Sequence, residues 1–293
     1  MHSHHIELNG RSFHYLEWGH AGRPVLLFLH GFPEYAGAWA ELAGRLAPQF
    51  HCIAPDQRGY GQSWAPPQVS AYRSSELVGD MTALIAHLGG GPVTVIGHDW
   101  GSAVAYGLAM FQPHLVDRLI VMNGVHPGPF QRAMAAGGAQ TLASQYMHTL
   151  KRDGAEDRLS AQDYGHLLSV FSAKMDMSWL TGDKLAAYKT EWARPGRLRG
   201  MLNWYRASPL KLGAPGQPIK APAYPTDKFQ VPMPHLLIWG MQDTALLPEA
   251  TQGLESWCPD LTRVQVPDAD HWLAHQQPGT VAEIIRTWLD TRT

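Results

Sequence analysis

The stretch VTVIGHDWGSAVA, residues 93–105, decides the fold. An apolar, β-branched run of strand length is followed by a Gly-x-Asp-x-Gly turn and then by small residues typical of a closely packed helix. Gly97 and Gly101 let the backbone bend sharply, so that the side chain of Asp99 projects above the end of the strand. A chance turn aspartate is the alternative, but the strand before it and the small-residue helix after it favour a catalytic nucleophile.

Further apolar runs surround this stretch. They occupy residues 25–29, 52–54, 119–122 and 236–239, and the strand Val264-Gln265-Val266 follows near the carboxyl end. Continuous apolar runs of this length are expected where helices cover both faces of a strand. Between the runs, residues 77–88 and 281–289 place their apolar side chains on one helical face. This alternation predicts an α/β fold with a mostly parallel sheet, helices on both faces, and a ligand site at the carboxyl ends of the strands.

The amino-terminal part predicts a β-hairpin. Residues 6–8 and 13–17 flank Asn9-Gly10, a dipeptide that accepts the positive backbone angles of a tight turn. The histidine cluster at residues 2–5 is more typical of a mobile terminus than of a metal site. No basic region followed by an apolar stretch marks the chain for export, so we expect a cytoplasmic protein.

The strand-helix alternation breaks between residues 126 and 234. Helical stretches rich in Tyr, Trp and Met predict an inserted lid, and a proline-rich tract at 214–234 returns the chain to the sheet. We therefore divide the chain into a first core part (1–125), a helical cap (126–222) and a second core part (223–293).

Composition excludes several classes of partner. The 293 residues are 45% hydrophobic and 16% charged, with a formal net charge of -2 and no basic block. We therefore expect no nucleic acid, no membrane span and a small uncharged ligand. Cys52 and Cys258 match no metal or disulfide spacing, which suits a reducing compartment. No cofactor and no metal are expected, and the oligomeric state is left open, a homodimer included.

Nearly the whole chain resembles the epoxide hydrolase branch of the α/β-hydrolase superfamily, which also includes haloalkane and haloacetate dehalogenases. Asp99 stands where most superfamily members carry serine, and His-Gly-Phe-Pro at residues 30–33 is similar to the His-Gly-x-Pro motif of that branch. The resemblance implies that the backbone N–H groups of Phe32 and Trp100 form the oxyanion hole. Two such fixed donors would meet charge that develops on the carbonyl oxygen of Asp99.

The same fold orders its catalytic residues as nucleophile, acid and histidine. Asp243 follows the apolar run at 236–239, and His271 follows the expected strand at 264–266. Asp268 and Asp270 are weaker candidates for the acid, and we interpret them as turn residues.

Two tyrosines in the predicted cap favour the epoxide hydrolases within this group. Asn-Trp-Tyr-Arg at residues 203–206 resembles a motif whose tyrosine, here Tyr205, hydrogen-bonds the oxirane oxygen. Tyr146 has the spacing of the second such tyrosine, although either ring could instead be a packing residue. Leu-Lys-Arg-Asp at residues 150–153 departs from the usual Phe-Gln-x-Pro, so His148 stays open as an alternative second donor.

Apolar and aromatic residues near these motifs are candidates for the pocket wall, with core packing as the alternative for each. They are Trp100, Phe32, Trp39, Trp179, Met147 and, as a polar neighbour, His148.

The choice of aspartate indicates the chemistry. A carboxylate that attacks an acyl carbon gives a reactive anhydride, whereas attack on a saturated carbon gives an ester that water can cleave. We therefore expect Asp99 to open a small apolar epoxide, tyrosine to protonate the oxygen, and His271, oriented by Asp243, to activate water. Haloalkane dehalogenase and a ligand receptor with slow turnover are the alternatives.

Overall fold

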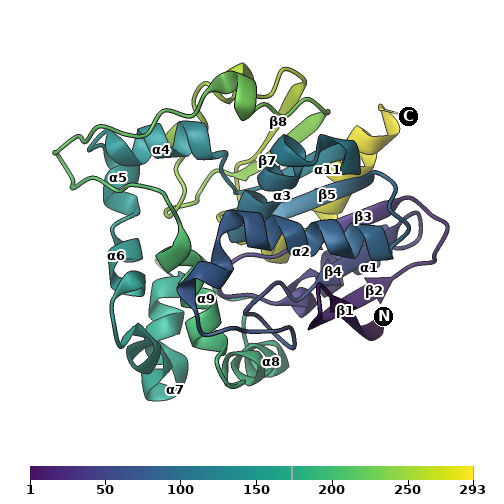
Figure 1. Ribbon diagram of the computed structural model, residues 1–293, viewed down its shortest axis with the longest axis horizontal. Helices are drawn as coiled ribbons and strands as arrows, with labels where there is room; N and C mark the ends of the chain where they lie inside the picture. The colour runs from purple at the N-terminus through teal and green to yellow at the C-terminus, as the bar shows by residue number, and fades with distance from the viewer. Residues whose placement is uncertain (173, 293) are drawn as a thin grey trace.

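The computed structural model describes residues 1–172 and 174–292. Its centre is an eight-stranded sheet with the order β1-β2-β4-β3-β5-β6-β7-β8 (Figure 1). The strands are β1 (His2–Leu8), β2 (Arg11–Trp18), β3 (Val25–Leu29), β4 (His51–Pro55), β5 (Val93–His98), β6 (Val116–Met122), β7 (His235–Gly240) and β8 (Leu261–Val266). β3 to β8 run parallel, whereas β1 and β2 pair antiparallel. The predicted mostly parallel sheet is confirmed.

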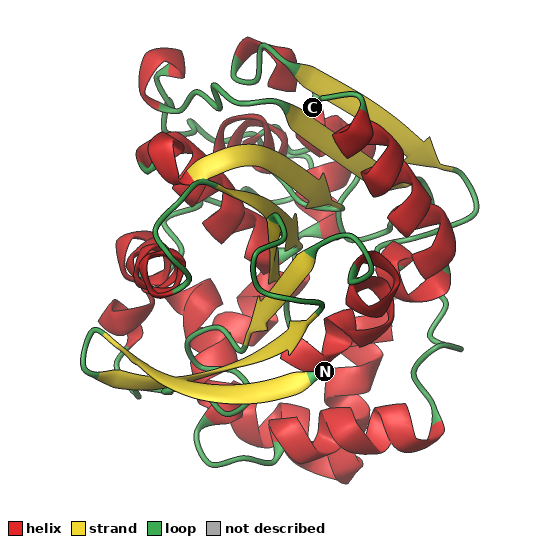
Figure 2. Ribbon diagram, turned by 90° about the vertical axis from the view of Figure 1, so that its right-hand side faces the viewer, coloured by secondary structure: helices red, strands yellow, loops and turns green. Residues whose placement is uncertain are grey.

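Both faces of the sheet are covered by helices (Figure 2). Leu26 and Phe28 of β3 belong to the hydrophobic core shared with α1 (Ala40–Leu46) and α11 (Pro278–Asp290). The alternate residues Leu27 and Leu29 belong to the core shared with α2 (Ser74–His87) and α3 (Trp100–Phe111). Because successive strand residues point to opposite faces, a strand between two helical layers is apolar at every position.

The amino-terminal hairpin is confirmed, but the expected mobile terminus is wrong. Asn9 and Gly10 adopt φ angles of 51° and 70°, as a tight hairpin turn requires. Residues 2–5 extend β1 because β2 supplies backbone partners along its whole length. His4 stacks on Tyr15 at 4.8 Å and lies 2.6 Å from a carboxylate oxygen of Glu17.

Helices fill the insertion between β6 and β7, as expected. They are α4 (Pro127–Ala135), α5 (Ala139–Ala143), α6 (Tyr146–Lys151), α7 (Ala155–Ser172), α8 (Gly182–Trp192) and α9 (Arg197–Ala207). α7 consists of two helical parts across a kink at residues 161–164. The helices α5 to α9 gather on one side of the sheet (Figure 1). The cap boundary at 126–222 stays a prediction.

The remaining elements are short. They are α10 (Leu273–Gln276) and the 3-10 helices η1 (Ala36–Trp39), η2 (Val69–Tyr72), η3 (Pro113–Leu115), η4 (Thr226–Lys228), η5 (Pro248–Thr251) and η6 (Leu254–Ser256).

His126 links the segment where the chain leaves the core for the cap to the segment where it returns. Its Nδ1 accepts from the N–H of Gly128 at the start of α4, and its Nε2 donates to the carbonyl of Phe229 on the return segment, at 3.1 and 2.9 Å.

The turn between β5 and α3 is as sharp as the sequence predicts. Asp99 adopts φ 48° and ψ -122°, a backbone conformation that residues other than glycine rarely adopt. A Cβ on Gly101 would lie 2.0 Å from the carbonyl oxygen of Leu29 and 2.6 Å from that of His30. Both obstacles are backbone atoms, so position 101 requires glycine.

We expect Gly101→Ala to lower the free energy of unfolding by at least about 2 kcal/mol, because the added methyl overpacks against fixed backbone. Gly44→Ala is the matched control, since Gly44 lies exposed in α1 and a Cβ there meets no atom within 4 Å. In the control, the free energy of unfolding should rise by about 0.5–1 kcal/mol, because alanine favours a helix more than glycine does. Urea unfolding followed by circular dichroism measures both, and equal midpoints for the two variants would contradict the close approach.

Candidate active site

Asp99 stands at the carboxyl end of β5 with one carboxylate oxygen already held. The backbone N–H of Phe32 donates to its Oδ1 at 2.7 Å. Trp100 begins α3, and the first N–H groups of a helix have no partner within it. A Cβ on Gly31 would lie 2.4 Å from that of Asp99, so glycine allows the loop after β3 to approach. Of the two predicted oxyanion-hole residues, Phe32 therefore donates to the Asp99 carboxylate, and Trp100 directly follows Asp99 in the sequence.

His271 lies between two carboxylates. Its Nδ1 donates to Oδ2 of Asp243 at 2.7 Å, and its Nε2 lies 3.7 Å from Oδ2 of Asp99. The three residues follow β5, β7 and β8, whose carboxyl ends meet at one edge of the sheet. The structure thus brings together the nucleophile, histidine and acid that the sequence predicts.

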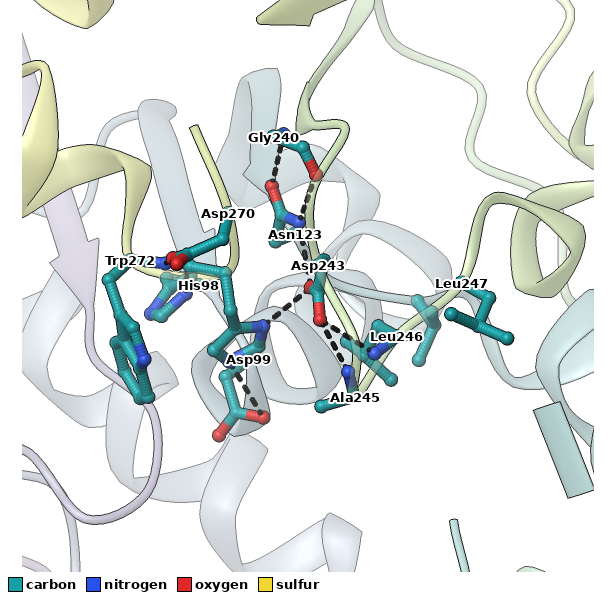
Figure 3. Close-up of polar contacts among 12 residues, drawn as sticks. His98, Asp99, Asn123, Gly240, Asp243, Ala245, Leu246, Leu247, Asp270 and Trp272 are labelled. Atoms are coloured by element: carbon teal, nitrogen blue, oxygen red, sulfur yellow. Dashed lines mark hydrogen bonds and ion pairs between the residues drawn. The ribbon is translucent and has the colours of Figure 1, made fainter. Parts of the chain in front are cut away.

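The carboxylate of Asp243 accepts hydrogen bonds from Ala245, Leu246, Asn123 and His271 (Figure 3). Its Oδ1 accepts from the N–H groups of Ala245 and Leu246, both at 2.8 Å, and its Oδ2 also accepts from the side chain of Asn123 at 2.7 Å. Asn123 in turn exchanges two hydrogen bonds with the backbone of Gly240 at the end of β7. Sequence reasoning missed Asn123, although a polar residue directly after the buried strand β6 was an available signal.

The charges around His271 set its protonation state. Burial acts to lower the pKa of His271, but the charge of Asp243, its hydrogen bond and the charge of Asp99 raise the pKa to about 9. Burial alone would raise the pKa of Asp243, yet the charge and hydrogen bond of His271 hold it below its ordinary value. In the resting protein at neutral pH, an imidazolium therefore stands between two carboxylates.

The buried carboxylate of Glu34 connects the site to neighbouring segments through hydrogen bonds. Its Oε1 accepts from Tyr188 of α8 at 3.0 Å and from His275 at 2.7 Å, and its Oε2 accepts from Nδ1 of His98 at 3.2 Å. Nε2 of His98 donates to the carbonyl of His271 at 2.8 Å. This network ties the cap and the His271 loop to the loop after β3. The sequence signal, an acidic residue directly after His-Gly-Phe-Pro, was not used.

The cap supplies the two predicted tyrosines. The ring of Tyr205 from α9 meets Phe32 and Trp100 edge to face, at centroid distances of 5.2 and 4.9 Å. The ring of Tyr146 from α6 lies 6.3 Å from that of Tyr205. Burial and the charge of Asp99 raise the pKa of Tyr146, and burial, Tyr146 and Asp99 raise that of Tyr205. Both phenols therefore keep their protons at neutral pH.

Two cavities meet at the nucleophile. The larger has a volume of about 550 Å³ and the smaller about 370 Å³. Asp99, Tyr146 and Tyr205 border both of them. Of the predicted wall residues, Trp100 and Met147 border the larger cavity. Phe32 borders the smaller one, as does His271.

Three predicted wall residues lie elsewhere. Trp39 is buried on the opposite face of the sheet, 5.3 Å from Phe28, because η1 packs on the α1 side. The ring of Trp179 stacks on that of His275 with a centroid distance of 3.8 Å, and Trp179 borders neither cavity. His148 is exposed, because residues two apart on α6 point to different sides of the helix. Of the two candidate donors on α6, only Tyr146 faces the nucleophile.

Two further observations concern metal ions and membranes. Within residues 1–172 and 174–292, no three or more His, Cys, Asp or Glu side chains gather in a way that could hold a metal ion. Over the same residues, no helix has both the length and the apolar character needed to cross a bilayer.

Comparison with known proteins places the chain among related sequences and folds. The family model described as alpha/beta hydrolase fold matches residues 24–278. The AB hydrolase superfamily protein YfhM of Bacillus subtilis is 33% identical over 97% of this chain and 96% of its own. Human epoxide hydrolase 4 is 31% identical over 98% of this chain and 78% of its own. A solved structure described as a novel epoxide hydrolase from hot-environment metagenomes has a TM-score of 0.86 and 35% identity, with 98% of both chains covered.

We expect His271 to titrate with a pKa of about 9 in NMR spectra of its ring protons, identified by their loss in His271→Gln. Asp243→Asn and Asp99→Asn should each lower that pKa, since each removes a negative charge that favours the imidazolium. The folded-state pKa lies above the ordinary 6.5, so this contribution to stability is complete below pH 6.5 and is lost as the pH rises through about 9. A pKa unaffected by either substitution would contradict the charge arrangement.

Proposed function

The chain belongs to the epoxide hydrolase branch of the α/β-hydrolase superfamily, and we propose that it opens small apolar epoxides with water to give vicinal diols. One observation carries the proposal: two cap tyrosines and the carboxylate of Asp99 border the same cavities, with His271 3.7 Å from that carboxylate. A nucleophile, acid donors and a base thus surround one space.

In the first step, Oδ2 of Asp99 attacks a ring carbon from the side opposite the oxygen. Oδ1, held by the N–H of Phe32, becomes the carbonyl oxygen of the resulting ester. Tyr146 and Tyr205 bind the epoxide oxygen, and one of them protonates it as the ring opens. The transfer is favourable because an alkoxide is far more basic than a phenolate, whose conjugate acid has a pKa of about 10.

In the second step, His271 changes from acid to base. Esterification removes the negative charge of Asp99, one of the causes of the raised pKa of His271. The imidazolium then releases its proton, which restores the tyrosine. Neutral His271 takes a proton from water as the water attacks the ester carbonyl, and the N–H groups of Phe32 and Trp100 stabilise the oxyanion. The diol and the Asp99 carboxylate are released, and His271 is again protonated.

The haloalkane alternative is less well supported by the geometry. A departing halide needs two N–H donors, and the side chain of Phe32 has none. Trp179, the other candidate, borders neither cavity. A receptor without turnover would not require the complete Asp99, His271 and Asp243 arrangement. The cytoplasmic location remains our proposal from the sequence, and the oligomeric state stays open, a homodimer included.

We expect the protein to release diol and no halide when offered a panel of alkyl epoxides, aryl epoxides and haloalkanes. Asp99→Ala should lower diol formation by more than about a thousandfold, because the nucleophile is lost. In a single turnover in ¹⁸O-water, mass spectrometry should find the label in the Asp99 carboxyl group rather than in the diol. Label in the diol alone would show direct attack by water on the ring and would overturn the ester mechanism.

Breakdown of the ester should slow as the pH falls, since only neutral His271 can accept the proton of water. The midpoint should lie below the pKa of about 9 of the resting protein, because the ester carries no charge beside the imidazole. Stopped-flow tryptophan fluorescence can follow the intermediate, and His271→Gln should accumulate it. A breakdown rate that stays constant from neutral to acidic pH would exclude His271 as the base.

A further inference from the structure

Helix α9 of the cap is bound to one loop of the core, residues 56–67 after β4. The indole Nε1 of Trp204 donates to the carbonyl oxygen of Arg58 at 2.9 Å, and both residues are buried. At the start of the helix, the guanidinium of Arg197 donates to the carbonyl oxygen of Gly61. The helix is therefore hydrogen-bonded to this loop near both of its ends.

Between these two bonds, the backbones of the helix and the loop are in contact. A Cβ on Gly200 of α9 would lie 2.7 Å from the Cα and from the carbonyl oxygen of Gly59, and a Cβ on Gly59 would lie 3.0 Å from the Cα of Gly200. The obstacles are backbone atoms on both sides. The helix can approach the loop this closely only because both positions are glycine.

These contacts lie on one face of α9, and Tyr205 lies beside that face. Arg197, Gly200 and Trp204 follow the spacing i, i+3, i+7, which places them on the same side of a helix. Tyr205 is the next residue, about 100° further around the helix axis, and it borders both cavities at Asp99. The contacts with the loop therefore set the rotation of α9 about its axis, and with it the direction of the Tyr205 side chain.

The loop is itself a fixed support. The guanidinium of Arg58 donates to both carboxylate oxygens of Asp80 on α2, each at 2.7 Å, and this ion pair is buried. The ring of Trp204 also meets the rings of Tyr60 and Trp100 edge to face, at centroid distances of 5.5 and 6.1 Å. Arg58 thus holds α2 through its side chain and α9 through its carbonyl oxygen.

We propose that Trp204 is a positioning residue for Tyr205: its indole N–H fixes the rotation of α9 and so holds the phenol at the epoxide oxygen. A rotation of the helix by about 10° would move that phenol oxygen by roughly 1 Å, because it lies far from the helix axis. A misplacement of this size can lower a rate by about a hundredfold. This inference rests on the proposed function, since Tyr205 binds an epoxide oxygen only in that reaction.

The proposal makes the two chemical steps respond differently. Ring opening uses the hydrogen bond from Tyr205, whereas hydrolysis of the ester uses His271 and water. Single-turnover reactions with styrene oxide, quenched in acid and followed by mass spectrometry of the intact protein, give the rates of formation and breakdown of the Asp99 ester. Trp204→Phe should slow ester formation by about tenfold and leave ester breakdown unchanged.

Trp288→Phe is the matched control. The indole of Trp288 is buried like that of Trp204 and donates to Oγ1 of Thr262 at 3.1 Å, but it belongs to the core on the other face of the sheet. Both rates should equal those of wild type in this variant. The comparison separates a lost indole hydrogen bond in general from one that positions Tyr205.

A double-mutant cycle shows whether Trp204 acts through Tyr205. Tyr205→Phe removes the hydroxyl that Trp204 is proposed to position. In the Tyr205→Phe background, Trp204→Phe should therefore change ester formation by less than about twofold, since the effects of residues that act as a unit are not additive. A purely structural role would give the same loss in both backgrounds.

Gly200→Ala tests the rotation of α9 without altering Trp204. The added methyl would meet the backbone of Gly59 and displace the helix, so ester formation should again be slower and ester breakdown unchanged. Gly44→Ala is the control, because a Cβ at Gly44 on α1 meets no atom within 4 Å. If Trp204→Phe does not fold, Gly200→Ala takes its place in the cycle with Tyr205→Phe.

The outcomes separate this inference from the proposed function. Unchanged ester formation in Trp204→Phe, an equal loss of both steps, or an equal loss in both backgrounds overturns the positioning role and leaves the proposed function standing. If Tyr205→Phe itself forms the ester at the rate of wild type, the role of Tyr205 in ring opening fails together with this inference. If wild type forms no ester on Asp99, the proposed function fails as well.

Discussion

The imidazolium of His271, which lies between the carboxylates of Asp99 and Asp243, is the group on which the site depends. Asp99 and Asp243 would repel each other at the end of the sheet if His271 did not lie between them with its proton. The parallel strands β5, β7 and β8 fix these three side chains, because their carboxyl ends meet at one edge. In the proposed reaction, alkylation of Asp99 would remove one of the two charges, which would lower the pKa of His271 and let it act as a base.

The core of this arrangement was predictable from the sequence because its signals are local. A strand covered on both faces is apolar at every position. The turn at Asp99 needs glycine at position 101, because a Cβ there would lie 2.0 Å from the carbonyl oxygen of Leu29. The order of Asp243 and His271 along the chain then follows from the order of the strands. The hairpin turn at Asn9 and Gly10 is predictable for the same reason.

The misplaced and missed residues depend on contacts between distant segments. Trp39 follows the same strand as Phe32, but η1 turns it to the other face of the sheet, and no local pattern records that choice. His148 and Tyr146 are two residues apart, and only the docking of α6 on α9 decides which side faces inward. Glu34 and Asn123 act through partners more than 60 residues away, such as Tyr188 and Gly240. Their positions directly after β6 and after His-Gly-Phe-Pro are local signals, but these signals do not name the partners.

The link that His126 makes between the start of α4 and Phe229 has an evolutionary consequence. Both passages of the chain between the layers converge on one imidazole, which lies within 3.1 Å of each of its two backbone partners. Changes in chain length between these two points that spare Tyr188 and its bond to Glu34 can therefore leave the sheet and its charged triplet undisturbed. Natural variation can therefore reshape the rest of the cavity above Asp99 while Tyr146, Tyr205 and the groups of the proposed reaction are kept.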